Sequence, residues 1–256
     1  MKHFYRVSYV SNAGVLLTFD NKKVLIDGFC NSVVPIFKNP PAEITTQITS
    51  GISPDKDIDI ILFTHHHSDH FDPQSTVNFL NQNPNTVVIA NHKALLAISR
   101  LQSAMANSHL VQADASGGAQ EKLHEIDGVR IEAFSLLHDG DEYKDVQNFA
   151  YLIEGGGKTV LHVGDAKPVS NNYMDLNLLE KNIDLLIAPF PYVGLASSRR
   201  VIENYIKPHK IAVVHFPYRE LDSGGWIDAT RKSFKSVENH FIDTVFFEDI
   251  GDCMYI

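Results

Sequence analysis

The chain has 256 residues, of which 44% are hydrophobic and 21% charged, a balance typical of a globular protein rather than a disordered one. Its formal net charge of −9 argues against a general binder of nucleic acid or anionic membranes, because such proteins present a basic face. The two cysteines form no close pair, the start lacks an apolar signal segment, and no apolar run approaches the ~20 residues that cross a bilayer, so we expect a cytoplasmic protein without membrane insertion.

The first predicted element is a β-hairpin in which residues 13–19 and 24–27 form strands around a polar turn. It ends in Asp27. Residues 28–57 follow and are rich in proline, threonine and serine. Insertions of this length are often functional rims or lids, so this segment is a candidate border of a site.

The rest of the chain alternates between apolar strands and amphipathic helices. We predict strands at 58–63, 86–90, 129–137, 183–188, 210–215 and 244–248, and helices at 74–81, 93–105, 174–181 and 197–206. A second hairpin, at 149–153 and 159–163, ends in Asp165 and repeats the first one, which suggests two similar halves packed face to face. The pattern predicts an α/β protein with mixed sheets covered by helices. No linker divides the chain, so we expect one domain over 1–256.

A histidine-rich motif, Thr64-His65-His66-His67-Ser68-Asp69-His70, directly follows the predicted strand 58–63. In an extended segment alternate side chains share a side, so His65 and His67 can bind one ion. If a helix follows, Asp69 and His70 lie in its first turn and can face a second ion. A solvated loop or a purification tag is the alternative, but a tag would lie at a terminus and would not follow a buried strand.

Three further candidate ligands, His138, Asp165 and His215, also follow predicted strands. Taken singly, His138 can be a polar loop residue, Asp165 a cap and His215 a core histidine. Their shared position at strand ends instead favours one site on a rigid scaffold. Five histidines and two aspartates suit Zn²⁺ best, with Fe or Mn also compatible.

In this order of motifs the chain resembles the metallo-β-lactamase superfamily of binuclear metal hydrolases. The resemblance spans nearly the whole chain, from Asp27 through the histidine motif to His215. It implies a four-layer αββα sandwich of two mixed sheets flanked by helices. The opening residues 9–14 and the insertion at 28–57 further resemble the branch that contains ascorbate-6-phosphate lactonase and N-acylphosphatidylethanolamine phospholipase D.

The resemblance also implies a role for each candidate residue. The first of two divalent ions would be bound by His65, His67 and His138, and the second by Asp69, His70 and His215. Asp165 would bridge both ions, and Asp27 would lie beneath the site and orient a ligand histidine. His66 matches a position that binds no metal and is expected to point away.

The expected activity is hydrolysis of an ester, lactone or phosphodiester in a small molecule, with a phosphorylated or lactone-like metabolite favoured over an antibiotic. Two cations about 3.5–4 Å apart lower the pKa of a shared water from ~15.7 towards ~7, and Asp69 is the expected catalytic residue that orients this water and moves its proton. Tyr192, Tyr218 and Arg219 follow predicted strands and are candidate substrate contacts, although they can equally be ordinary rim residues.

Two other functions remain open at this point: an iron-dependent redox enzyme of the dioxygenase kind on the same scaffold, and a metal-binding protein without catalytic activity. The complete ligand set argues against the second. The acidic charge argues against a nucleic-acid partner. The sequence does not indicate the oligomeric state.

Overall fold

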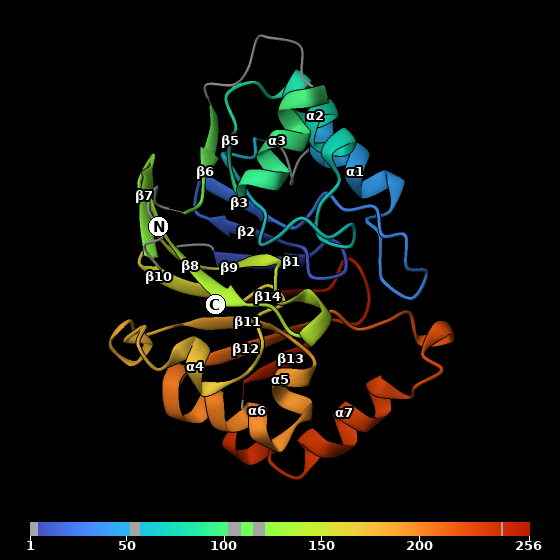
Figure 1. Ribbon diagram of the computed structural model, residues 1–256, viewed down its shortest axis with the longest axis vertical. Helices are drawn as coiled ribbons and strands as arrows, with labels where there is room; N and C mark the ends of the chain where they lie inside the picture. The colour runs from blue at the N-terminus through green and yellow to red at the C-terminus, as the bar shows by residue number, and fades with distance from the viewer. Residues whose placement is uncertain (1–4, 52–56, 102–108, 115–120, 242) are drawn as a thin grey trace.

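The computed structural model describes residues 5–51, 57–101, 109–114, 121–241 and 243–256, and Figure 1 shows their arrangement in four layers. Two seven-stranded sheets lie face to face, and helices cover the outer face of each. This is the αββα sandwich of two mixed sheets that the resemblance implied. Among the described residues, no helix combines the length and the apolar character needed to span a membrane.

The two sheets are built on one plan. In each, the strands at one end of the sheet pair in antiparallel fashion and the strands at the other end in parallel. The first sheet has the order β14 (Cys253–Tyr255), β1 (Tyr5–Tyr9), β2 (Val15–Phe19), β3 (Lys22–Ile26), β4 (Ile60–Leu62), β5 (Val87–Ala90) and β6 (Leu110–Gln112). The second has the order β13 (Thr244–Phe246), β12 (Lys210–Val214), β11 (Leu185–Pro189), β10 (Lys158–His162), β9 (Gln147–Gly155), β8 (Val129–Leu137) and β7 (Glu121–Ile126).

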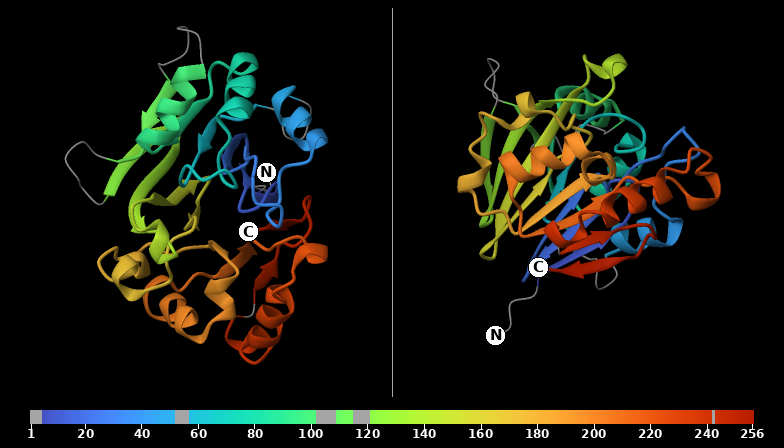
Figure 2. Two further views of the ribbon diagram at one scale, coloured as in Figure 1. Left: turned by 45° about the vertical axis from the view of Figure 1, so that its right-hand side comes forward. Right: turned by 90° about the horizontal axis from the view of Figure 1, so that it is seen from below.

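The helices form two groups on opposite sides of the sandwich (Figures 1 and 2). The first sheet is covered by α1 (Ala42–Thr49), α2 (Pro73–Gln82) and α3 (His92–Leu101). The second is covered by α4 (Ser170–Tyr173), α5 (Pro191–Gly194), α6 (Ala196–Val201) and α7 (Trp226–Lys235). A π-helical turn at Ile202–Ile206 continues α6.

Alternation along the strands explains why both faces of each sheet are buried. In β9, Phe149, Tyr151 and Ile153 lie in the apolar core between the sheets. Ala150 and Leu152 point the other way, into the core beneath the helices of the second half. Successive side chains of a strand point to opposite faces, so a continuous apolar run serves a sheet covered on both sides.

Most of the predicted elements are present, but the helix predicted at 174–181 is wrong. There α4 ends at Tyr173, and only a 3-10 turn at Leu178–Glu180 follows, because Asn177 adopts a left-handed backbone conformation that interrupts a helix. The insertion at 28–57 contains α1. The helix predicted at 93–105 is α3 as far as Leu101, and its last four positions lie outside the described residues. The helices α5 and α7 and the strands β1, β6, β7 and β14 were not predicted from the sequence.

Candidate metal centre

The seven candidate ligands follow the ends of four strands, β4, β8, β10 and β12, and the fold brings them together between the two sheets. They form two groups in which one potential ligand atom of each residue lies within 4.8 Å of the others. The first group is His65, His67 and His138, and the second is Asp69, His70, Asp165 and His215. These are the two sets that the resemblance implied, with the proposed bridging residue, Asp165, falling in the second.

In the first group, three imidazole nitrogens face one another. His65 Nε2 lies 3.1 Å from His67 Nδ1 and 3.3 Å from His138 Nε2. Ligand atoms that surround a tetrahedral ion at about 2.0–2.1 Å are separated by about 3.3–3.4 Å. The nitrogens are therefore spaced as a metal ion would require.

In the second group, a carboxylate oxygen lies at the centre. Asp165 Oδ2 is 3.2 Å from His70 Nε2 and 3.4 Å from His215 Nε2. The same oxygen is 3.7 Å from His138 Nε2 and 3.9 Å from His65 Nε2, which belong to the first group. Asp165 thus lies between the two groups.

Several buried atoms in the second group have no protein hydrogen-bond partner. They are His70 Nε2, Asp165 Oδ1 and His215 Nε2. A buried polar atom without a partner is costly and needs an explanation. Nitrogen and carboxylate ligands left open in this way fit divalent cations, so the residues present are suitable for the group that the resemblance implied.

The turn that carries Asp69 and His70 precedes a helix rather than belonging to it. The N–H groups of His70 and Phe71 both donate to the carbonyl of His67, and α2 begins only at Pro73. Asp72 caps that helix by accepting from Ser75 N. The condition considered from the sequence, a helix that directly includes Asp69 and His70, is not met, because α2 begins three residues after His70. A compact turn still directs both side chains at the site.

Asp27 lies beneath the centre, fully buried, and connects the ends of β3 and β4. Its Oδ1 accepts from Thr64 N at 2.8 Å, and its Oδ2 accepts from Thr64 Oγ1 at 2.6 Å. The same Oδ2 lies 2.8 Å from His70 Nδ1, so His70 presents its other nitrogen, Nε2, to the site. A carboxylate that orients a ligand histidine in this way is a common feature of metal sites.

Two backbone features fix the ligands from the second sheet. Gly164 has a φ of +55°, and a Cβ there would lie 2.5 Å from Asn148 Oδ1 and 2.7 Å from Thr64 Cβ. This close packing lets Asp165 N donate to Asn148 Oδ1 at 3.0 Å. His215 also has a positive φ, 65°, and its N–H donates to Asn12 O. Such strained conformations in non-glycine residues concentrate at functional sites.

In the absence of metal, the histidines of the two groups differ in pKa. Burial lowers the pKa of His65 and lowers that of His67 to about 4, since a buried imidazolium loses hydration. Burial acts the same way at His70 and His215, but nearby carboxylates, chiefly that of Asp165, outweigh it. They raise the pKa of His70 well above its ordinary value and that of His215 to about 9. At neutral pH the second group therefore holds protons that a cation must displace.

His66 and the three proposed substrate contacts lie in different surroundings. The His66 ring is half-buried beside Asn91 Nδ2, 3.5 Å away, and is in neither group. Tyr192 is buried and donates to Ala166 O at 2.8 Å. Arg219 is exposed and pairs with Asp228 and Glu248 at 3.2 and 2.9 Å, while the Tyr218 ring lies 5.7 Å from Lys38 Nζ. Of these three, only Tyr192 lines the cavity beside the centre.

Three residues that position the candidate ligands had no role predicted from the sequence: Asn12, Thr64 and Asn148. Asn12 is fully buried, and its Nδ2 donates to Asp69 Oδ2 at 3.0 Å. Thr64 is the first residue of the histidine-rich motif, and its position after a predicted strand was the available signal. No local pattern singles out Asn148, since it lies within β9 and acts through a contact with residue 165.

Comparisons with known proteins agree with this architecture. A family model described as a β-lactamase superfamily domain matches residues 6–207. A UPF0173 metal-dependent hydrolase from Staphylococcus haemolyticus is 24% identical over 242 residues, covering 89% of this chain and 93% of that protein. Another from Saccharolobus solfataricus is 26% identical over 161 residues, 62% of this chain and 61% of that protein.

Solved structures share the fold. A protein from Veillonella parvula described as a possible metal-dependent hydrolase superposes with a TM-score of 0.71 at 16% identity, over 99% of this chain and 100% of the other. The metallo-β-lactamase fold protein YhfI from Bacillus subtilis gives 0.65 at 15% identity, over 100% of both chains. With the family match covering most of its length, the chain belongs to the metallo-β-lactamase superfamily, as a metal-dependent hydrolase.

Proposed function

We propose that the chain is a binuclear hydrolase that forms one metallo-β-lactamase-like domain over residues 1–256 and cleaves an ester, lactone or phosphodiester bond of a small molecule. The observation that carries this proposal is the position of Asp165 Oδ2, within 3.2–3.9 Å of four imidazole nitrogens drawn from both ligand groups. Seven ligands exceed what one tetrahedral ion uses. Their nitrogen and carboxylate chemistry makes zinc the most suitable metal, with Mn or Fe as alternatives.

When bound, two such ions supply Lewis acidity that polarises the substrate and lowers the pKa of a water towards neutrality. The chain's residues contribute orientation and proton transfer. Asp69 is the proposed catalytic residue that orients the water and accepts its proton. Asn12 holds the carboxylate of Asp69 from behind, and Asp27 fixes the ring of His70. These groups are buried, so little reorganisation accompanies reaction.

The test combines metal analysis with a substrate screen. Purified protein is loaded with zinc, manganese or iron(II), analysed for bound metal, and assayed on generic ester, lactone and phosphodiester substrates. We expect two ions per chain and hydrolysis of at least one bond type, lost with a chelator and restored by metal. One ion or none per chain contradicts the binuclear centre. Substrate oxidation that needs iron and oxygen, without hydrolysis, contradicts the hydrolase.

A further inference from the structure

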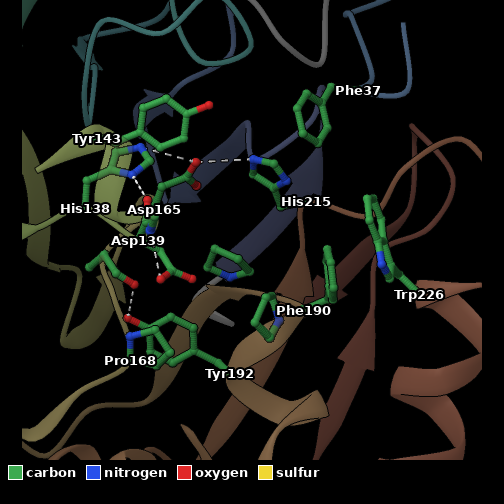
Figure 3. Close-up of a pocket in the computed structure, with 14 residues that line it drawn as sticks. Phe37, His138, Asp139, Tyr143, Asp165, Pro168, Phe190, Tyr192, His215 and Trp226 are labelled. Carbon is green, nitrogen blue, oxygen red and sulfur yellow. Dashed lines mark hydrogen bonds and ion pairs between the residues drawn. The ribbon is translucent and has the colours of Figure 1, made fainter. Parts of the chain in front are cut away.

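A cavity of about 280 Å³ opens directly beside the candidate metal centre. Three of its lining residues, His138, Asp165 and His215, belong to that centre. Figure 3 shows His138 and Asp165 on one side of the cavity and the rings of Phe190 and Trp226 on the other. A molecule whose reacting bond lies at the metal ligands therefore has its remaining part in this cavity.

Beside the candidate ligands, the lining of the cavity is mostly apolar and aromatic. It includes the rings of Phe37, Tyr143, Phe190 and Trp226, together with three prolines. Phe190 is stacked on Trp226 with ring centroids 6.2 Å apart and an interplanar angle of 20°. Phe190 also stacks on the fully buried Phe216, at 5.3 Å and 20°. The wall is thus supported from behind by the core, while the partly exposed Trp226 and Tyr143 keep surface for a ligand.

The position of Tyr143 depends on the turn before it. Gly140 has a φ of +87°, and a Cβ there would lie 2.8 Å from Tyr143 Cδ2. The Tyr143 ring is packed edge-on against two candidate ligands, with its centroid 4.9 Å from that of His67 and 5.1 Å from that of His138. Tyr143 therefore lines the cavity in direct contact with two candidate ligands of the first group.

Away from the candidate ligands, the described lining of the cavity offers no cationic side chain to a ligand. None of the described residues that line it is a lysine or an arginine. Arg219 is paired with Asp228 and Glu248, and the Lys38 ammonium donates to the carbonyls of Phe216 and Pro217. The lining does contain the carboxyl of Asp139. A second anionic group on a substrate, away from the metals, would be desolvated against apolar rings without a partner.

We propose that the substrate is an uncharged carboxylic ester or lactone that carries an aromatic ring, with the ring packed against Phe37, Phe190 and Trp226. The assignment rests on the proposed hydrolytic function of the same centre. A cavity of about 280 Å³ is at the lower end of the ~300–1,000 Å³ typical of small-molecule sites. It suits one ring with a short chain rather than a long acyl chain.

The reaction balances without a further reactant. The oxygen of water bonds to the carbonyl carbon, and the bond from that carbon to the alcohol oxygen breaks with its electron pair on the alcohol oxygen. One proton of water is transferred to that oxygen, and the other is released as the acid becomes a carboxylate. No oxidant or reductant takes part.

Binding can be measured without metal or turnover, because Trp226 is the single tryptophan of the chain. Metal-free protein is titrated with benzyl acetate and with ethyl acetate, which lacks the ring, while tryptophan fluorescence is followed. We expect a saturable change with benzyl acetate and at least tenfold weaker binding of ethyl acetate. Equal binding of ethyl acetate, or no saturable change with benzyl acetate, overturns the assignment.

Substitutions test whether benzyl acetate binds in this cavity. Phe37→Ala removes part of the wall from a loop and should weaken benzyl acetate binding at least tenfold. Leu179→Ala, an exposed apolar position in the 3-10 turn at 178–180, is the matched control and should bind as the wild type does. If Phe37→Ala fails to fold, Phe190→Leu, which keeps an apolar side chain but removes a ring of the proposed contact, provides the same comparison. A pocket variant that folds and binds with wild-type affinity contradicts the assignment.

The metal-loaded protein separates this inference from the proposed function. With the aromatic lactone dihydrocoumarin and the aliphatic δ-valerolactone, we expect a KM at least tenfold lower for the aromatic one. If the protein hydrolyses bis(4-nitrophenyl) phosphate but neither lactone nor phenyl acetate, the substrate assignment is wrong and the proposed hydrolytic function is retained. A saturable Trp226 response with no hydrolysis of any ester, lactone or phosphodiester overturns the proposed function, and the substrate assignment with it.

Discussion

Neighbouring histidines of the motif have different surroundings although their sequence context is nearly the same. His65 is fully buried, and its Nε2 faces nitrogens of two other histidines. His67 is half-buried and completes that group. His66 points instead towards Asn91. Strand-like alternation along three residues therefore separates the candidate ligands from the residue between them.

This difference can be tested with a matched pair of alanine variants. His67→Ala removes one of the three nitrogens of the first group, so we expect bound metal to fall from two ions per chain towards one. His66→Ala removes a ring outside both groups and should leave bound metal nearly unchanged. Elemental analysis after dialysis measures both. Equal metal loss from the two variants would show that the ligand assignment within the motif is wrong.

Asp165 is the residue whose change should affect both ions. Its Oδ2 lies among histidines of the two groups, and its Oδ1 is buried without a partner. Asp165→Asn keeps the shape but removes the negative charge, so both ions should bind more weakly, and activity should fall by at least 100-fold. Isothermal titration with zinc checks the affinities. Retention of both ions at wild-type affinity contradicts the bridging position.

At the scale of single residues, the sequence predicted the clustering of the candidate ligands better than the surroundings of the candidate substrate contacts. Metal ligands are few in kind and their spacing follows strand geometry, so the seven candidates could be named before the fold was known. Arg219 shows the opposite case. It follows a strand end, yet the structure pairs it with Asp228 and Glu248, which come from α7 and from the segment after β13. Which side chains a surface arginine meets depends on distant segments that a local pattern does not reveal.

Strand ends explain why the site lies at one edge of the sandwich. β3 and β4 run parallel, as do β10, β11 and β12, so the carboxyl ends of each set meet at the same edge of its sheet. Sequence reasoning could identify these strands because they are continuous apolar runs. It missed β14, a three-residue strand that pairs with β1 at the sheet edge, because its pairing comes from the opposite end of the chain.

The contact of Asp27 with Thr64 and His70 joins two of these elements and can be tested on its own. In the wild type, Asp27 Oδ1 accepts from Thr64 N, while Oδ2 accepts from Thr64 Oγ1 and lies beside His70 Nδ1. Asp27→Asn replaces this carboxylate with an amide. The His70 ring should lose its fixed orientation, and metal affinity should fall about 10- to 100-fold. Competition with a fluorescent zinc chelator measures this change.

A control distinguishes this effect from a general loss of stability. Asp59 makes a comparable set of contacts, with Lys22 Nζ and Lys23 N, at the opposite ends of the same two strands. Asp59→Asn should lower the free energy of unfolding without changing zinc affinity. If both variants weaken zinc binding to the same extent, Asp27 acts only through the stability of the sheet.

Over the whole molecule, each ligand group contains residues from both halves. In the first, His65 and His67 follow β4 of the first sheet and His138 follows β8 of the second. In the second, Asp69 and His70 belong to the first half, while Asp165 and His215 follow β10 and β12. Metal ions bound here would link the two sheets, so metal binding should stabilise the entire fold rather than one loop.

We therefore expect the melting temperature to rise on zinc binding. Each ligand group contributes one part of this rise, and the two parts depend differently on pH. At a free concentration 100-fold above Kd, one ion adds about 2.7 kcal/mol, and in a chain of this size each kcal/mol is worth roughly 2–4 °C. Without metal, the pKa of His215 is raised to about 9 and that of His70 is also raised, so protons compete with metal at the second group at every pH below about 9. Burial lowers the pKa of His67 to about 4, so protons compete little at His67 above pH 5.

Because a metal ion must displace protons from the second group, the metal affinity of that group falls as the pH falls, while the first group keeps its ion. At fixed free zinc, we expect two ions per chain and the full rise in melting temperature at pH 8.5, and one ion with about half the rise at pH 6. Scanning calorimetry and elemental analysis of the same samples give both quantities. His67→Ala should lose most of the rise at pH 6, because only the protonated group remains. Simultaneous loss of both ions over one narrow pH range would contradict the difference between the two groups.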